Sequence, residues 1–223
     1  LLDVPYGENT KVKDGYVYYS SNNSKFSIID ARIPTDVKFI KTITASQRIV
    51  DLDIADDLLV LLYYDSSSTD FVSGLYVYNI SDLENPVFSG STTGVVNPSS
   101  LVATKEFAFV ADEGTHALWT FDIRNPLSPK VIGMVDFPYR ANYCPIDPPH
   151  LGIYKKKAFV TDYCSSSPPV YLDVFDLSYP ASPVVIGTAE YDHSISSPNP
   201  YKALDATSNH AYAPTSDGLR IVD

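Results

Sequence analysis

Three aspartates lie on short apolar segments that are typical of β-strands. Asp51 and Asp53 are two positions apart in Ile49–Ile54, and Asp205 lies in Ala203–Thr207. Glycoside hydrolysis needs two carboxyl groups at a defined separation, one of which is the proton donor. Hard cations such as Ca²⁺ and Na⁺ also prefer oxygen ligands. These residue types indicate either a glycoside hydrolase or a cation site, provided that the fold brings the two segments together.

The other reactive side chains lack the spacing of a chemical site. The four histidines fall in separate parts of the chain, at His116, His150, His193 and His210. We interpret them as surface or loop residues. Cys144 and Cys164 form no Cys-x-x-Cys pattern, so the sequence predicts neither a zinc site nor thiol catalysis. We therefore expect no catalytic residue and no metal-ligand cluster among these side chains.

A short apolar stretch that ends in Asp or Asn recurs five times along the chain. The stretches are FSIID at Phe26–Asp30, LYVYN at Leu75–Asn79, LWTFD at Leu118–Asp122, LDVFD at Leu172–Asp176 and LRIVD at Leu219–Asp223. Their last residues, at positions 30, 79, 122, 176 and 223, are 49, 43, 54 and 47 positions apart. Self-similarity at such a period predicts a repeat architecture, in which each repeat is one supersecondary unit.

Each repeat divides into short strands that are rich in Val, Ile, Tyr and Phe and are bounded by turn residues. In the third repeat we expect strands at Ser99–Thr104, Phe107–Asp112, Leu118–Ile123 and Lys130–Asp136. The second and third strands are apolar at nearly every position, which is typical of strands covered on both faces. The Asp or Asn that ends each third strand is interpreted as a cap of its own turn, because such side chains accept backbone hydrogen bonds two residues on.

A β-propeller covers both faces of its strands by arranging four-stranded sheets around an axis. We predict one all-β domain over residues 1–223, a five-bladed propeller of four-stranded antiparallel blades. The blades are expected roughly at 8–46, 47–94, 95–138, 139–192 and 193–223 plus 1–7. The first strands of the repeats would line the central channel. We predict no cofactor, and the alternative is a Ca²⁺ held in that channel by Asp51, Asp53 and Asp205.

The fifth repeat lacks a fourth strand, and the N-terminus offers a candidate. Leu1–Tyr6 matches Met134–Tyr139, the fourth strand of the third repeat. The N-terminal strand would then complete the last blade and close the ring, which removes open edges that promote aggregation. The alternatives are a trimmed part of a longer array and a strand that pairs with a neighbouring molecule. The chain opens at Leu1 without Met, so we interpret it as a processed or trimmed product.

The repeats resemble LVIVD repeats, a β-propeller family that is named for the motif of its third strand. The resemblance lies in Gly218–Asp223 (GLRIVD), in Phe107–Asp112 (FAFVAD) and in the connections Asp82–Val87 and Ser178–Val184. It covers most of the chain, although the first repeat is degenerate and the fourth carries insertions. The resemblance implies a propeller of bacterial or archaeal surface proteins and implies no fixed activity, since a fold does not settle function.

The fourth repeat departs most from the pattern, because it contains two insertions. Phe137–Tyr154 is rich in Tyr and Pro, and Cys164–Tyr171 is rich in Ser and Pro. Insertions in repeat proteins map to loops on one face, which is often the binding face. We predict that these loops dock a sugar or a protein, with the alternative that they only pack over the edge of the blade. The candidate binding residues are Tyr139, Tyr143, His150 and Tyr154.

Cys144 and Cys164 flank the second strand of this repeat. They are either two unrelated buried thiols or one disulfide across adjacent strands, and we predict the disulfide. Disulfides persist in oxidising compartments. Two Asn-x-Ser sequons, at Asn22 and Asn79, are compatible with N-glycosylation there. We therefore expect an extracellular or cell-surface protein.

The formal net charge of −11 narrows the range of partners. Binding to nucleic acid or to an anionic membrane surface needs Lys and Arg, so we expect neither partner. No apolar run approaches the roughly 20 residues that span a bilayer, so we expect no membrane insertion. The predicted function is a non-catalytic interaction or assembly module that binds proteins or itself. The alternatives are a carbohydrate-binding propeller and, third, a glycoside hydrolase.

Overall fold

The computed structural model describes residues 7–21, 24–66, 72–138, 149–164, 167–191, 205–207, 210–215 and 218–222. These residues form strands and turns, and no helix occurs among them. The strands make four four-stranded sheets and one three-stranded sheet, and all strand pairs are antiparallel. The prediction of an all-β protein built from four-stranded antiparallel units is confirmed.

The strands follow chain order within every sheet. The first sheet contains β1 (Gly7–Lys13), β2 (Tyr16–Ser21), β3 (Lys25–Asp30) and β4 (Lys38–Thr44). The second contains β5 (Arg48–Ala55), β6 (Leu58–Tyr64), β7 (Ser73–Asn79) and β8 (Val87–Val95). The third contains β9 (Pro98–Ala103), β10 (Phe107–Asp112), β11 (Ala117–Asp122) and β12 (Lys130–Asp136).

The remaining two sheets come from the C-terminal part of the chain. The fourth contains β13 (His150–Tyr154), β14 (Lys157–Cys164), β15 (Ser167–Asp176) and β16 (Val184–Tyr191). The fifth contains β17 (Asp205–Ala206), β18 (Ala211–Thr215) and β19 (Gly218–Val222).

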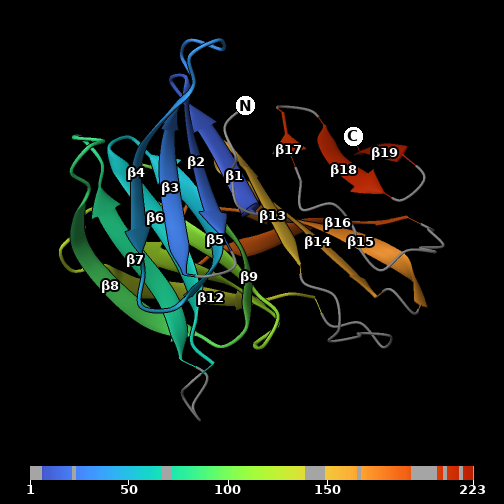
Figure 1. Ribbon diagram of the computed structural model, residues 1–223. Coiled ribbons are helices and arrows are strands. Elements are labelled where there is room, and N and C mark those ends of the chain that lie inside the picture. Colours follow the sequence, from blue (N-terminus) through green and yellow to red (C-terminus); the bar gives the residue numbers. More distant parts are fainter. Residues whose placement is uncertain are drawn as a thin grey trace.

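The five sheets follow one another around a common axis, as Figure 1 shows. The first strand of each sheet is the innermost: β5 contacts β1 and β9, and β13 contacts β9 and β17. Leu1–Tyr6, which we expected in the last blade, lies outside the described residues. Closure of the ring by the N-terminal strand therefore stays a prediction.

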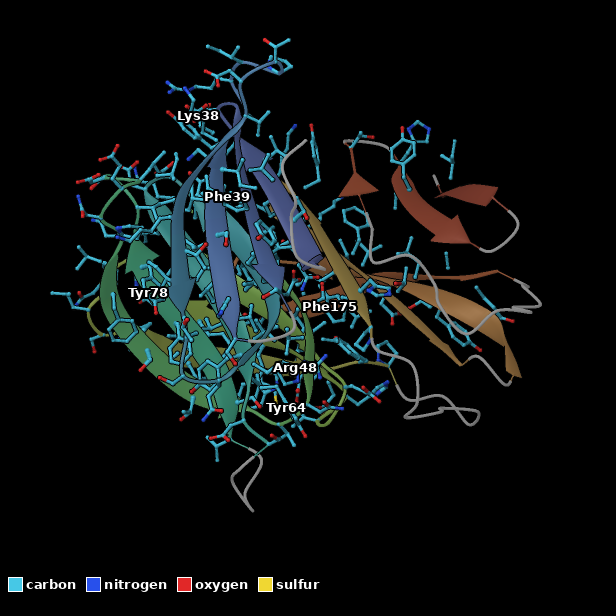
Figure 2. All side chains as sticks on the ribbon, in the orientation of Figure 1. Lys38, Phe39, Arg48, Tyr64, Tyr78 and Phe175 are labelled. Atoms are coloured by element: carbon cyan, nitrogen blue, oxygen red, sulfur yellow. The ribbon has the colours of Figure 1, made fainter. Side chains whose placement is uncertain are left out.

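Hydrophobic clusters fill the spaces between successive sheets, where Figure 2 shows dense side chains. Strand β6 shows why its sequence is apolar throughout. Leu59 and Leu61 belong to the cluster shared with the first sheet, whereas Val60 and Leu62 belong to the cluster shared with the third. All four are completely buried, and each such side chain contributes about 1.5–3 kcal/mol to folding.

Two inner strands lie where the sequence predicted none. Gly7–Lys13 forms β1. Its sequence is polar because an inner strand turns one face towards the channel, so no apolar pattern indicated a strand there. His150–Tyr154 forms β13, so the expectation that these five residues belong to a loop is wrong. His150 is 8% exposed and its backbone pairs with Thr161. The interpretation of His150 as a surface or loop residue is therefore wrong as well.

The connection from the third to the fourth strand is the same turn in four sheets. A backbone N–H donates to the carbonyl three residues earlier in Ile33–Asp36, Asp82–Asn85, Asn125–Ser128 and Tyr179–Ser182. The second position of this turn is Pro34, Leu83, Pro126 or Pro180, and proline suits that position because its φ is fixed near the required value. The turn therefore separates the third strand from the fourth in each of these sheets.

Two glycines of outer strands make room for the same turn of the next sheet. A Cβ atom on Gly90 of β8 would lie 2.6 Å from the carbonyl oxygen of Pro126, and one on Gly133 of β12 would lie 2.4 Å from that of Ala181. Gly187 occupies the corresponding position of β16, opposite Val174 as Gly133 is opposite Thr120. A Cβ atom there would lie within 4 Å of no atom in the described residues.

Candidate functional site

The inward carboxylates of β5 join three inner strands. Asp51 Oδ2 accepts a hydrogen bond from Leu101 N at 2.8 Å, and Asp53 Oδ2 accepts one from Ala103 N at 2.8 Å. Both donors belong to β9 of the next sheet. Asp53 Oδ1 lies 3.3 Å from Lys11 Nζ of β1 on the other side. The two aspartates therefore connect β1, β5 and β9.

Burial changes the acidity of one of these groups. Asp51 Oδ1 also accepts a hydrogen bond from Leu52 N at 2.8 Å. Burial raises the pKa of the Asp51 carboxyl to about 6, although the Leu101 and Leu52 N–H groups and the Lys11 ammonium favour its charged form. A raised pKa is common at catalytic sites, but here it comes from burial between two sheets.

Similar polar contacts join the neighbouring inner strands. Asn9 Nδ2 of β1 donates to Val50 O of β5. Between β9 and the fourth sheet, Ser99 Oγ donates to Pro149 O at 2.7 Å, and Leu151 N donates to Ser100 Oγ at 3.2 Å. Side chain–backbone contacts thus recur at each of the first three junctions between sheets. The carboxylates of β5 are one version of a repeated structural feature.

The third aspartate of the predicted channel site cannot be added to this geometry. Asp205 lies in β17 and its backbone pairs with Tyr212, but its side chain lies outside the described part of the structure. In that part, no three or more His, Cys, Asp or Glu side chains gather in a group that could hold a metal ion. The Ca²⁺ in the channel stays a prediction.

In four sheets the residue that ends the third strand caps its own turn, as predicted, and Asp223 of the fifth lies outside the described residues. The carboxylate or amide oxygens of Asp30, Asn79, Asp122 and Asp176 each accept a hydrogen bond from the backbone N–H two residues on, at 2.8–3.1 Å. In the first and third sheets that residue is Arg32 or Arg124, whose guanidinium also binds the carboxylate. These hydrogen bonds lower the pKa of Asp30 and of Asp122 to about 2.

The predicted binding loop lies mostly outside the described residues. This applies to Tyr139, Tyr143 and Cys144, and the described part of Cys164 is its backbone, which pairs with Ser167. Tyr154 is half-buried at the end of β13, with Lys155 Nζ 5.1 Å from its ring centroid. The disulfide and the binding role of these residues therefore stay predictions.

The two sequons differ in what the structure describes. Asn22 lies outside the described residues. Asn79 is exposed, and its Oδ1 accepts hydrogen bonds from the Ser81 N–H at 2.9 Å and the Ser81 hydroxyl at 2.7 Å. Ile80 between them is 4% exposed, so a glycan at Asn79 would have to be attached before this turn folds. Glycosylation at both positions stays a prediction.

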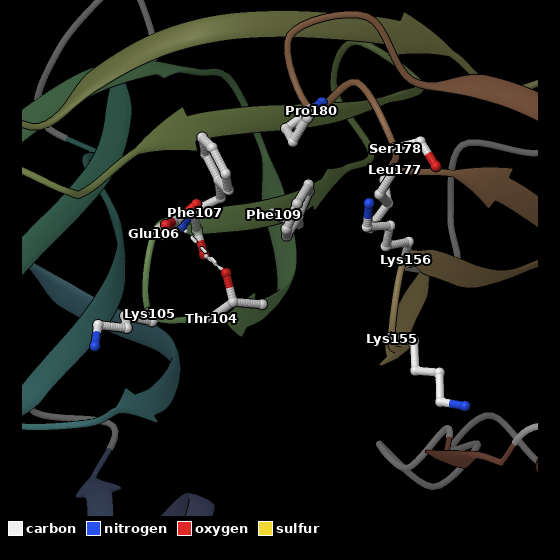
Figure 3. A pocket seen from close by; sticks show the side chains of 10 residues that line it. All are labelled: Thr104, Lys105, Glu106, Phe107, Phe109, Lys155, Lys156, Leu177, Ser178 and Pro180. Atoms are coloured by element: carbon white, nitrogen blue, oxygen red, sulfur yellow. Dashed lines mark hydrogen bonds between the residues drawn. The ribbon is translucent and has the colours of Figure 1, made fainter.

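A pocket of about 520 Å³, which no sequence motif indicated, opens between the third and fourth sheets (Figure 3). We call it the intersheet pocket. It is lined by Thr104, Lys105, Glu106, Phe107, Phe109, Lys155, Lys156, Leu177, Ser178 and Pro180. Figure 3 shows Phe107 and Phe109 on one side and Leu177 and Lys156 on the other. The pocket therefore combines apolar walls with basic side chains.

Comparisons with known proteins show the fold alone. No protein-family model matches the chain, and no curated protein matches it. A periplasmic gluconolactonase from Pseudomonas aeruginosa superposes with a TM-score of 0.67 over 97% of this chain and 65% of its own, at 10% identity. The N-terminal domain of Nup159 gives 0.55 over 96% and 59%, at 13% identity.

A hypothetical selenium-binding protein from Sulfolobus tokodaii gives a TM-score of 0.61 over 80% of this chain and 53% of its own, at 12% identity. The chain thus spans 53–65% of the length of these three structures. The described part of the chain contains no helix long and apolar enough to cross a membrane. The likeness to the gluconolactonase and to Nup159, both β-propellers, together with the four-stranded sheets around one axis, shows that this chain has a β-propeller fold.

Proposed function

We propose that this chain is a non-catalytic β-propeller that serves as an interaction or assembly module on the cell surface or outside the cell. The observation that carries the proposal is the bonding of the channel carboxylates. Each of the four oxygens of Asp51 and Asp53 has a partner: Leu52 N, Leu101 N, Ala103 N or Lys11 Nζ. Glycoside hydrolysis needs two carboxyl groups that face the substrate, and this bonding favours a structural role instead.

The proposal includes five blades, a ring closed by Leu1–Tyr6, and membership in the LVIVD-repeat family. The recurring turn after each third strand, with its Asp or Asn cap, supports the family assignment because it reproduces the quoted motifs in space. The sequential contacts of β1, β5, β9, β13 and β17 support five blades.

The proposed location rests on sequence features. A Cys144–Cys164 disulfide and glycans at Asn22 or Asn79 would form in an oxidising, secretory environment. The partner would be a protein or a second copy of this chain, and the propeller would serve as a subunit of a larger surface structure.

Carbohydrate binding is the second candidate, and the intersheet pocket favours it. Its volume lies in the range of small-ligand sites, and its walls combine aromatic rings with a few polar groups. A glycoside hydrolase comes third, since the bonding of Asp51 and Asp53 speaks against it.

Two measurements on the purified chain test the first candidate. Aryl-glycoside and lactone hydrolysis should show no turnover that is lost in an Asp51→Asn/Asp53→Asn variant. Sedimentation velocity should show association that increases with concentration, as a self-assembling module requires. Turnover that disappears in the double variant would refute the proposal in favour of the hydrolase.

A further inference from the structure

The turn that borders the intersheet pocket carries a different residue from the turn between the first two sheets. Leu83 and Pro180 both hold the second position of the recurring turn, in the second and fourth sheets. Leu83 packs against the first cluster together with Tyr16 and Ile40, and so fills the space between the first two sheets. Pro180 is shorter than leucine and leaves the corresponding space next to Phe107 open. Pro126 holds the same position at the junction of the second and third sheets, so the exchange of leucine for proline is one contribution to the space.

The charge around the intersheet pocket is opposite to the charge at the junction of the first and second sheets. The turn between the first two strands is Asp56-Asp57 in the second sheet and Lys155-Lys156 in the fourth. The carbonyls of Asp57 and Lys156 accept equivalent hydrogen bonds, from Ile80 N at 2.8 Å and from Leu177 N at 2.7 Å, which fixes the correspondence. On the facing side, Lys105 stands where the first sheet has Asp14.

The acidic groups near the pocket are mostly bound elsewhere. Asp122 is paired with Arg124 at 2.6 Å, and Asp176 accepts the Ser178 N–H at 2.8 Å and has its pKa lowered by Ser178 and the nearby lysines. Glu106 is the acidic residue of the lining itself. Three lysines therefore outnumber one lining carboxylate, in a chain whose net charge is −11.

Two of these lysines have no close ion pair with a carboxylate of the described residues. Lys105 lies 3.6 Å from the Asp56 carboxylate, whereas neither Lys155 nor Lys156 has a carboxylate within ion-pair distance in the described residues. Lys155 rests on the Tyr154 ring, where a cation is held weakly and can be redirected. Phe107 is half-buried and keeps part of its ring exposed to the pocket, beneath Arg124 at 5.5 Å. The site offers positive charge beside an apolar ring surface.

We propose that the intersheet pocket binds a small ring-shaped ligand that carries a carboxylate or sulfate group. The ring lies against Phe107, Leu177 and Pro180, and the anion is held by Lys156, which lies beside Leu177 (Figure 3), and by Lys155 once it turns from its place over the Tyr154 ring. Acidic sugars and aromatic acids share this chemistry. The site is independent of Asp51 and Asp53, so its failure would leave the proposed non-catalytic role untouched.

The experiment is a titration followed by calorimetry at low salt, with D-glucuronate and benzoate as probes. Glucose and benzyl alcohol are their neutral counterparts. We expect saturable binding of at least one anionic probe and at least tenfold weaker binding of its neutral counterpart. Binding of glucuronate identifies an acidic sugar as the source of the ligand, and binding of benzoate alone identifies an aromatic acid. Absence of saturable binding of both anions below about 10 mM would overturn the proposal.

Two variants locate the site. Lys155→Gln/Lys156→Gln should weaken binding at least tenfold, whereas Lys25→Gln/Lys41→Gln removes the same charge from exposed lysines of the first sheet and should leave it unchanged. Pro180→Leu should abolish binding by filling the space as Leu83 does, in a turn that accepts leucine in the second sheet. Equal weakening by both lysine pairs, or unchanged binding in a folded Pro180→Leu variant, would contradict the assignment.

Discussion

Alanine substitutions at two equivalent glycines test how the turns pack on the outer strands. A Cβ atom on Gly133 would lie 2.4 Å from Ala181 O, where ordinary contact begins at 3.4 Å, so the turn of the fourth sheet would have to move by about 1 Å. Such overpacking costs about 1–3 kcal/mol. On Gly187 the added atom meets nothing in the described residues, and replacing glycine there gains about 0.4–1 kcal/mol from the unfolded chain.

We therefore expect Gly133→Ala to be less stable than Gly187→Ala by about 1–4 kcal/mol. Urea unfolding followed by circular dichroism measures both free energies, and an unchanged m-value shows that the comparison is valid. Gly90→Ala serves as a second clashing variant, because its Cβ would lie 2.6 Å from Pro126 O. Equal destabilisation by Gly187→Ala and Gly133→Ala would refute the reasoning and would show that another segment packs on β16.

Three further predictions concern single interactions. Asp51 has a pKa of about 6 in the folded protein, against an ordinary value of 3.8, so the protonated carboxyl stabilises the fold below pH 3.8 and this contribution is lost as the pH rises towards 6. The free energy of unfolding of the wild type, relative to that of Asp51→Asn, should therefore fall by up to about 3 kcal/mol over this range. A difference that does not change with pH would contradict the raised pKa. Asp122→Ala should lower the free energy of unfolding by about 0.5–2 kcal/mol at pH 7, because the turn loses its cap. Thermal unfolding measures this loss, and an unchanged melting temperature would contradict the role of the cap. Leu83→Pro should open a pocket between the first two sheets and cost about 2–4 kcal/mol of stability; a calorimetric scan that shows an unchanged transition would count against the equivalence of Leu83 and Pro180.

The second and third strands of the sheets could be predicted, because burial on both faces gives them an unbroken apolar sequence. The predicted bounds of Phe107–Asp112 agree with β10, and those of Lys130–Asp136 agree with the outer strand β12. The inner strand β1 was missed because its sequence is polar, and β13 was missed because it lies within the insertion Phe137–Tyr154, which interrupts the repeat. Leu1–Tyr6 lies outside the described residues, so the predicted closure is still untested.

The candidate site was less predictable than the fold. Asp51 and Asp53 were identified from their spacing. Their hydrogen-bond donors are the backbone N–H groups of Leu101 and Ala103, 50 residues away. A backbone donor cannot be predicted from a pattern of side chains. The intersheet pocket is lined by Pro180, at the turn position that Leu83 holds between the first two sheets. Aligning the turns Asp56-Asp57 and Lys155-Lys156 would have revealed the reversal of charge at that junction.

The measurement that tests the central claim most directly is the free energy of unfolding of Asp53→Ala by urea titration. If Asp53 holds β1, β5 and β9 together, removing the bonds to Lys11 Nζ and Ala103 N lowers stability by about 1.5–3 kcal/mol. Residues kept for catalysis are commonly neutral or stabilising when removed. A variant as stable as the wild type, or more stable, would contradict the structural role on which the non-catalytic proposal depends.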